Sequence, residues 1–493
     1  MKTNVAVTST PVLTHEGGKA SHIKPLEELR RAVMTCLLFE STMYEDGDSL
    51  ASRIAALVHQ VPLNEVAKLA IEARSEMQLR HVPLFLVSEM SKQKNSGTIV
   101  ADTLEAVIQR ADELSEFLAI YWKHGARKPW NHCDKCTGYI GPCTTCPYCI
   151  RPTIPQTKHP LSAGIKRGLA RAFTKFNAYS LAKYNGDGAV KLRDVMFLTH
   201  PKPTFTGKDG VLIQAANWKK LADNTLESPD TWEVALSAGK DKKETFERLI
   251  LEGKLGGLAV LRNLRNMQKA GVNNDIIRER LKDGCGRCLP FRFVVAAKYA
   301  PMLEDALETA MFKGLEDMPM LPGKTALLVD LSGSMYYKLS AGYDSSPHMQ
   351  YHLCATSEET SRKDVAAGLA MLLREKAQQL SVASFTTEVA NVAPRRGFAL
   401  RDAIIKSLPS GGTHLKSALV KLQNMPDWKD ADRVIVITDE QSQDGCAPAW
   451  CKKSYIINVA PYAKGVGYDS GWCHINGWSE RVIDYIQAIE SEV

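Results

Sequence analysis

The chain places hydroxyl and carboxylate side chains directly after two short apolar runs and before one helical segment. Short apolar runs of this kind indicate buried strands, and residues that follow parallel strands meet at one edge of a sheet. Such oxygen donors suit Mg²⁺ or another divalent cation, which keeps several waters and leaves room for an oxygen from a partner. The predicted ligands are Asp330, Ser332, Ser334, Thr413 and Asp439. The alternative is a serine-rich turn whose hydroxyls cap a helix and bind no ion.

These residues resemble a known metal site. Asp330-x-Ser332-x-Ser334, with Thr413 and Asp439 each at the end of an element, is similar to the metal-ion-dependent adhesion site of von Willebrand factor A (VWA) domains. Strand-like and helix-like segments alternate over 322–493, which predicts a doubly wound α/β VWA domain there. The expected strands are 325–329, 381–386, 433–438 and 454–460, and the expected helices are 362–380, 415–423 and 479–489.

The preceding part of the chain, 25–317, is expected to be helical. Apolar residues recur there at three- and four-residue spacing, and strand-like runs are nearly absent. A helix series of this kind usually stacks into a solenoid or superhelix. The predicted fold class is therefore α plus α/β, with the boundary near Met318.

Composition excludes several classes of protein. The chain has 493 residues, of which 44% are hydrophobic, too many for a disordered chain. No stretch approaches the ~18 apolar residues of a membrane helix. Residues 1–24 lack an apolar run and are expected to be a disordered tail, not a secretory signal. We therefore expect a cytoplasmic protein without membrane contact, whose 12 cysteines are reduced thiols or metal ligands.

Positive charge is unevenly distributed along the chain. The net charge is +7, yet residues 322–493 hold 18 Lys and Arg against 19 Asp and Glu. The basic surplus therefore lies in the helical part, and the segment 161–202 holds eight basic and two acidic residues. Lys166, Arg167, Arg171 and Lys175 are about one helical turn apart, so a helix spanning 163–184 would align them for contact with phosphates. An ordinary solvated helix face is the alternative.

The same segment resembles the core of the TROVE module. Three other stretches support the resemblance: Leu29-Arg30-Arg31 leading to Phe39-Glu40 and Tyr44, Leu258–Met267, and Leu289-Pro-Phe-Arg-Phe293. A TROVE region followed by a VWA domain is the arrangement of the Ro family. The resemblance implies a HEAT-like helical-repeat ring closed by the VWA domain.

The resemblance also implies partners and RNA-binding residues. Ro-type proteins bind noncoding Y RNA on an outer basic surface and single-stranded ends of misfolded RNA in the ring. They act in RNA quality control, or as adaptors to an exoribonuclease. We therefore expect a nonenzymatic, monomeric protein within a ribonucleoprotein, with no DNA partner. By position, the RNA-binding residues would be Lys166, Arg167, Arg171, Lys175, Lys183, Lys191, Arg193 and His200. His200 could instead cap the preceding helix.

A cysteine-rich insertion at 131–151 departs from the family pattern. Pairs of thiolates two residues apart can bind Zn²⁺, and four complete a tetrahedral structural site. The first choice of ligands is Cys133, Cys136, Cys146 and Cys149, with Cys143 as an alternative. Cys285 and Cys288 form a possible second pair, His132 and His124 are possible substitutes, and unmetallated thiols remain the alternative.

Two functional classes stay open. The basic residues favour an RNA-binding protein, whereas the hydroxyl and carboxylate set favours a metal-dependent protein-interaction scaffold. An enzyme is not expected, because neither a nucleophile–base pair nor a phosphate-binding loop is evident. A two-metal nuclease would need more clustered carboxylates than Asp330 and Asp439.

Overall fold

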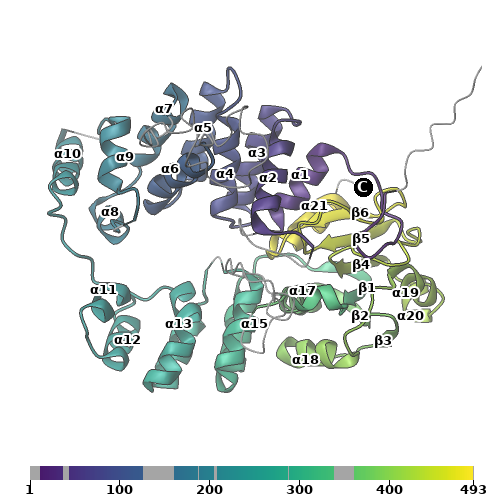
Figure 1. Cartoon of the computed structure of the whole chain (residues 1–493). Coiled ribbons are helices and arrows are strands. Elements are labelled where there is room, and N and C mark those ends of the chain that lie inside the picture. Colours follow the sequence, from purple (N-terminus) through teal and green to yellow (C-terminus); the bar gives the residue numbers. More distant parts are fainter. Residues whose placement is uncertain are drawn as a thin grey trace, which may run out of the picture. The chain divides into compact units, whose positions relative to one another are not determined.

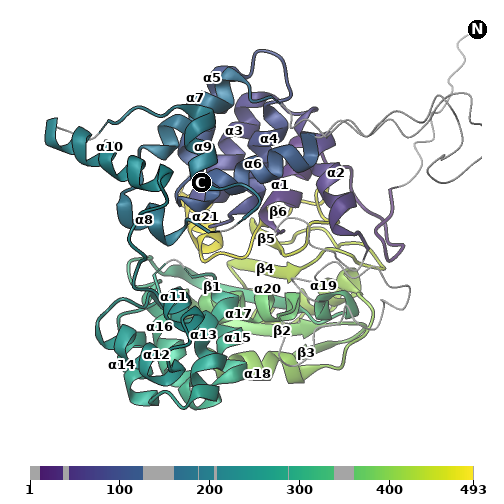
Figure 2. The same ribbon diagram turned by 60° about the vertical axis from the view of Figure 1, so that its left-hand side comes forward.

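The computed structural model describes residues 12–36, 44–125, 160–186, 188–204, 208–286, 288–337 and 360–491. The chain forms two compact units. Unit 1 comprises Met1–Glu65, Glu72–Val82 and Asp230–Val493, and unit 2 comprises Val66–Ile71 and Pro83–Pro229. The fold is rich in α-helix and contains one sheet in the described residues (Figures 1 and 2).

The sheet of unit 1 has six strands in the order β3-β2-β1-β4-β5-β6 (Figure 1). All neighbours are parallel except β3, which runs antiparallel to β2. The strands are β1 (Leu321–Asp330), β2 (Ala377–Phe385), β3 (Val389–Asn391), β4 (Arg433–Thr438), β5 (Lys453–Asn458) and β6 (Cys473–Asn476). The sequence predicted β1, β2, β4 and β5, and missed the short strands β3 and β6.

Both faces of this sheet are buried. Along β1, Leu327 and Val329 enter one hydrophobic core while Ala326 and Leu328 enter another, because successive side chains point to opposite faces. Helices α17 (Arg362–Lys376), α18 (Gly397–Ser407) and α21 (Arg481–Ser491) contribute to the first core. Helices α19 (Leu415–Leu422) and α20 (Pro426–Lys429) contribute to the second. A parallel sheet covered on both faces is doubly wound.

One predicted helix is shorter than expected. The sequence predicted a single helix over 362–380, but α17 ends at Lys376. Ala377 then takes an extended backbone conformation and opens β2, where Gln379 pairs with Lys324 of β1. Pairing with the central strand overrides the helical tendency of these four residues.

The first core also extends into the helices that precede the sheet. Phe246, Leu264 and Phe291 belong to the same buried cluster as the strand residues Leu327 and Ile435. The core therefore continues across Met318, where the sequence suggested a boundary. The remaining helices wholly within unit 1 are α1 (Pro25–Met34), α2 (Gly47–Val58), α11 (Trp232–Ser237), α12 (Lys242–Leu251), α13 (Gly257–Ala270), α14 (Asn274–Lys282), α15 (Pro290–Tyr299), η1 (Pro301–Leu303), α16 (Glu304–Lys313) and η2 (Gly333–Tyr336).

Unit 2 is built from helices that follow one another along the chain (Figure 2). They are most of α4 (His81–Met90), then α5 (Gly97–Val107), α6 (Asp112–Gly125), α7 (Ala163–Phe173), α8 (Ala178–Lys183), α9 (Leu192–Thr199) and α10 (Lys208–Ala222), while α3 (Leu63–Ser75) is divided between the units. Helices α5 and α7 approach closely, since a Cβ on Gly164 would lie 2.4 Å from the carbonyl oxygen of Gly97. Among the described residues, no helix combines the length and apolar character that crossing a bilayer requires.

The helix predicted over 163–184 is two helices. The chain leaves α7 at Thr174, and the Asn177 side chain accepts a hydrogen bond from Ser180 N over 2.9 Å to begin α8. Asparagine favours such a cap because its side chain satisfies a free N–H of the first turn. Leu169, Phe173 and Phe176 are nevertheless buried, on both sides of this break.

Candidate functional site

The first part of the candidate site is the turn after β1. The backbone N–H of Ser332 donates to Asp330 Oδ1 over 2.8 Å, which fixes the turn at the end of the strand. The hydroxyl oxygens of Ser332 and Ser334 lie 3.3 Å apart. All three side chains are buried. The structure therefore brings these three predicted residues together.

Thr413 lies on a segment that is tied to this turn. Gly333 N–H donates to the carbonyl oxygen of Gly411 over 2.9 Å, and Gln443 N–H donates to the carbonyl oxygen of Thr413 over 2.8 Å. A Cβ on Gly412 would lie 2.6 Å from Gln443 Oε1, so a larger residue there would displace the end of the Gln443 side chain. The side chain of Thr413 is buried at this junction.

Asp439 follows β4, next to β1 in the sheet. Thr438 Oγ1 donates to Asp330 Oδ2 over 2.6 Å, so the two strand ends are joined by a buried hydrogen bond. Gln441 N–H donates to Asp439 Oδ1 over 3.1 Å. Asp439 Oδ2 is buried and has no hydrogen-bond partner among the described residues. An unpaired buried carboxylate oxygen is costly and marks a place where an ion or a donor fits.

The two carboxylates share a low-dielectric environment. Burial, and then the charge of Asp439, raises the pKa of Asp330 to about 7. Burial likewise raises the pKa of Asp439. A cation bound beside both groups would stabilise their ionised forms.

The donor set fits a hard divalent cation such as Mg²⁺. Carboxylate and hydroxyl oxygens are the ligands such ions prefer, and the free Asp439 Oδ2 supplies an oxygen without breaking an existing bond. Within the part of the chain that the structure describes, no group of three or more His, Cys, Asp and Glu side chains could hold a metal. An ion at this edge would therefore depend on the hydroxyls of Ser332, Ser334 and Thr413 as well as on the two aspartates.

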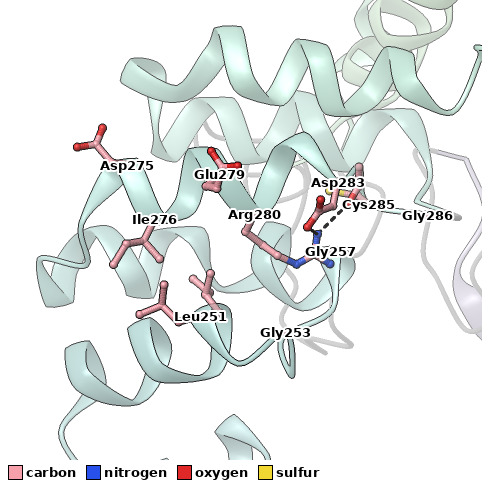
Figure 3. A pocket seen from close by; sticks show the side chains of 12 residues that line it. Leu251, Gly253, Gly257, Asp275, Ile276, Glu279, Arg280, Asp283, Cys285 and Gly286 are labelled. Carbon is pink, nitrogen blue, oxygen red and sulfur yellow. Dashed lines mark hydrogen bonds and ion pairs between the residues drawn. The ribbon is translucent and has the colours of Figure 1, made fainter.

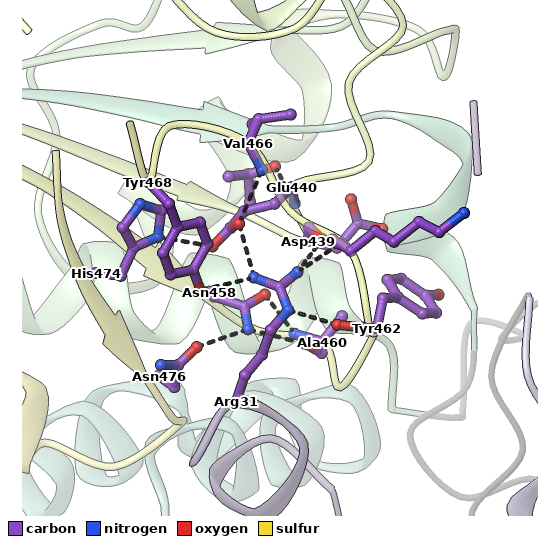
Figure 4. Close-up of polar contacts among 12 residues, drawn as sticks. Arg31, Asp439, Glu440, Asn458, Ala460, Tyr462, Val466, Tyr468, His474 and Asn476 are labelled. Carbon is purple, nitrogen blue, oxygen red and sulfur yellow. Dashed lines mark hydrogen bonds and ion pairs between the residues drawn. The ribbon is translucent and has the colours of Figure 1, made fainter. Parts of the chain in front are cut away.

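A buried ion pair holds the segment that carries Asp439 (Figure 4). Arg31 of α1 lies 2.7 Å from Glu440, and both side chains are completely buried. Glu440 also accepts from Val466 N–H over 3.2 Å and lies 3.1 Å from His474 Nδ1. Its backbone has φ +61°, a left-handed conformation that non-glycine residues rarely adopt. These partners fix the turn next to Asp439, a role for Arg31 that the sequence did not reveal.

Residues near the N-terminus also contact this segment. Thr14 Oγ1 donates to the carbonyl oxygen of Ser442 over 2.8 Å, and His15 N–H donates to Gln441 Oε1 over 3.0 Å. Ser21 forms a β-bridge with Gly465. The sequence predicted a disordered tail over 1–24. Residues 12–24 are instead placed by these contacts, and 1–11 lie outside the described residues.

The basic residues predicted to contact RNA divide into two groups. Lys166 and Arg167 on α7 are exposed, and no ion pair with the described residues engages them. Arg171 instead pairs with Asp102 over 2.7 Å. Lys175 lies beyond the end of α7 and donates to the carbonyl oxygens of Glu105 and Ile108. The structure thus uses Arg171 and Lys175 to join α7 to α5, and leaves Lys166 and Arg167 facing solvent.

The other four predicted RNA contacts lie on α8 and α9. Lys183 Nζ is 5.5 Å from the centre of the Tyr184 ring. Lys191 precedes α9 as its N-cap, and Arg193 is half-buried within it. His200 is exposed, has φ +48° and ends α9 as its C-cap, which is the alternative role the sequence suggested.

The predicted zinc ligands are only partly described. Cys133, Cys136, Cys143, Cys146 and Cys149 lie outside the described residues, as does His132. Cys285 and Cys288 precede α15, both are buried, and Cys288 Sγ donates to the carbonyl oxygen of Cys285 over 3.0 Å. The role of this pair in metal binding stays a prediction.

A pocket of about 850 Å³ adjoins this pair. Leu251, Glu279, Arg280 and Cys285 are among its lining residues (Figure 3). Arg280 donates to the carbonyl oxygens of Leu255 and Gly284, which holds the guanidinium at the wall. Apart from Cys285, none of the predicted site residues lines it.

Comparison with known sequences relates one segment of the chain to a known family. Residues 223–314, from α11 to α16, match the TROVE domain family. Telomerase protein component 1 from Mus musculus is 35% identical over 91 residues, and its Rattus norvegicus counterpart is 34% identical over 91 residues. Each match covers 17% of this chain, which spans 4% of the length of those relatives.

One solved structure is similar over nearly the whole chain. The crystal structure of the Deinococcus radiodurans RO (RSR) protein superposes with a TM-score of 0.52 at 15% sequence identity. The superposition covers 95% of this chain and 100% of that protein. The likeness shows a shared fold, whereas the family model matches residues 223–314.

Proposed function

Because the chain resembles TROVE proteins of the Ro type in sequence and in fold, we propose that it binds RNA and forms a ribonucleoprotein. The observation that carries this proposal is the exposed pair Lys166 and Arg167, which no acidic side chain of the described residues neutralises. Free cations on a helix surface release counterions when they contact phosphates, and this release favours association. The protein acts by binding and not by catalysis.

The proposal extends to the class of RNA. A small noncoding RNA of the Y type binds the surface formed by α7, α8 and α9, where Lys183 and Arg193 extend the positive charge. Single-stranded ends of misfolded RNA enter a ring of helices, and the complex serves RNA quality control or recruits an exoribonuclease. The setting is cytoplasmic, with one copy of the chain per ribonucleoprotein. These details follow from the Ro resemblance.

Charge reversal on α7 tests RNA binding. The double substitution Lys166→Glu/Arg167→Glu should weaken binding of a structured RNA about tenfold or more and reduce the salt dependence by about two counterions. Lys421→Glu/Lys429→Glu is the matched control, because both lysines are exposed and lie in unit 1. Equal affinities for the wild type and the α7 variant, measured by filter binding across a salt series, would contradict the proposal.

A second function is supported by a separate observation. The free Asp439 Oδ2 among buried hydroxyls supports a VWA-like site that binds Mg²⁺. Asp330, Ser332, Ser334 and Thr413 would hold the ion directly or through water, with Asp439 more suited to contact through a bridging water. The bound ion would supply an open coordination position for a carboxylate oxygen of a protein partner.

Removal of one carboxylate tests the second function. Asp330→Ala should abolish Mg²⁺ binding measured by calorimetry, because it removes the carboxylate that anchors the donor set. Its RNA affinity should match that of the wild type, since distant sites contribute independently. Undiminished Mg²⁺ binding by a folded Asp330→Ala protein would exclude this site.

A further inference from the structure

Arg362 lies near the candidate metal site without a hydrogen bond or ion pair to the part of the chain that the structure describes. Arg362 is the first residue of α17 and is completely buried, yet none of its three guanidinium nitrogens makes a hydrogen bond with the described residues. Its Cζ lies 5.8 Å from the centre of the Tyr462 ring. A buried guanidinium without partners is costly, and the positive end of the helix dipole adds to that cost. A nearby anion must therefore balance this charge.

Among the described residues, the acidic side chains near Arg362 leave Asp439 as the candidate for that anion. Glu440 is paired with Arg31 over 2.7 Å, and Asp364 is paired with Lys298 over 2.8 Å. Lys363, the next residue of α17, lies 3.6 Å from the centre of the Tyr336 ring and adds no negative charge. Asp439 keeps one carboxylate oxygen without a hydrogen-bond partner among the described residues. A hydrogen bond from Ser334 and the charge of Arg362 both act to lower the pKa of Asp439 against the larger effect of burial.

The charge count of the site then depends on Arg362. Asp330 and Asp439 together would neutralise a divalent cation, and Arg31 is already neutralised by Glu440. With Arg362 included, the metal-loaded site carries one net positive charge. A site with a net positive charge attracts an anionic ligand more strongly than a neutral oxygen donor. A site with no net charge has little such electrostatic preference.

We propose that Arg362 determines the ligand preference of the metal site. Because Asp330 and Asp439 together balance only the metal, the charge of Arg362 makes the loaded site cationic, so the open position selects a carboxylate over a neutral oxygen ligand. The same charge repels the metal and keeps its binding weak in the absence of the anion. This inference rests on the proposed Mg²⁺ site and assigns a specificity-determining role to a residue that is not itself a ligand.

Calorimetric titration of the full chain with Mg²⁺ alone tests whether Arg362 weakens metal binding. Arg362→Gln should bind Mg²⁺ about tenfold more tightly, because a repelling charge is removed. Arg362→Lys, which retains the charge, should stay within about twofold of the wild type by the same Coulomb argument. Arg395→Gln is the matched control, since Arg395 is exposed and lies outside the site. A disrupted fold would weaken Mg²⁺ binding instead, so the direction of the change separates the two explanations.

The preference of the metal site for a carboxylate is tested by repeating the Mg²⁺ titrations in the presence of acetate or of acetamide at constant ionic strength. Acetate should tighten Mg²⁺ binding to the wild type and to Arg362→Lys, because the two ligands are thermodynamically linked. Acetamide should have no such effect, and Arg362→Gln should lose the acetate response. Weaker Mg²⁺ binding by a folded Arg362→Gln protein, or an unchanged acetate response, would overturn the inference while leaving the metal site in place. Absence of Mg²⁺ binding to the wild type would overturn both.

Discussion

Replacement of Arg31 by methionine should destabilise the Asp439–Glu440 turn by about 3–5 kcal/mol, because it leaves a buried carboxylate without its ion-pair partner. Arg31 and Glu440 lie 2.7 Å apart with no exposed side-chain surface, so water cannot replace the lost charge. The guanidinium also donates to the carbonyl oxygens of Tyr462 and Lys464. Methionine retains the aliphatic volume and removes these donors.

Hydrogen exchange of the peptide covering residues 433–442 measures this loss locally, since amide protection reports the free energy of opening each segment. Arg30→Met is a stringent control, because the neighbouring Arg30 pairs with Glu72 through side chains that are 35% and 22% exposed. A partly solvated pair contributes about 1 kcal/mol or less. Combining Arg31→Met with Glu440→Gln should cost less than the sum of the single changes, since both remove the same interaction. Similar losses for Arg30→Met and Arg31→Met would refute the role assigned to the buried pair.

Three further predictions concern the helices, the cysteines and the separation of the two functions. Gly164→Ala should lower the stability of unit 2 by about 1–3 kcal/mol through overpacking against Gly97, whereas Gly186→Ala, with open space around its Cβ position, should have little effect in thermal unfolding. Elemental analysis of protein purified without added metal should find about one Zn²⁺ per chain, because the thiolates within Cys133–Cys149 can complete a tetrahedral site. Sub-stoichiometric zinc with five freely reactive thiols would exclude it. Chelation of divalent ions should leave RNA affinity unchanged, since the basic residues of α7 belong to unit 2 and the metal-site residues to unit 1. Loss of RNA binding on chelation would mean that the metal itself holds RNA.

The parts of the site that the sequence predicted are those specified by local pattern. A buried parallel strand is an uninterrupted apolar run, and the residues after it must lie at the sheet edge. Asp330 and Asp439 could therefore be placed together although 108 residues separate Thr438 from the carboxylate it contacts. The strands β3 and β6 were missed because runs of three and four residues give too few positions for a periodic signal.

Contacts between residues that are far apart in the sequence were harder to predict from local pattern. Charge spacing placed Arg171 and Lys175 on an RNA-binding face, but α5 supplies Asp102 and two carbonyl oxygens that engage them. Asn177 was a local signal of the break after α7, because asparagine is a strong helix N-cap. Arg362 also carried a local signal, since a cation at the start of a helix is unfavourable unless an anion lies nearby.

The segment 439–443 joins parts of the chain that sequence reasoning assigned to different domains. Arg31 binds Glu440 from the first helix, and Thr14 binds the carbonyl oxygen of Ser442 from the segment before it. A fragment limited to 322–493 lacks both contacts. Glu440, the residue after Asp439, would then have no ion-pair partner and would either stay buried as an unpaired charge or move into water. Such a fragment should bind Mg²⁺ at least about tenfold more weakly than the full chain, because restoring the ligand geometry would require the turn to refold without its partners. Equal affinities in calorimetric titration, for a fragment that retains its circular dichroism, would show that the sheet alone positions Asp439.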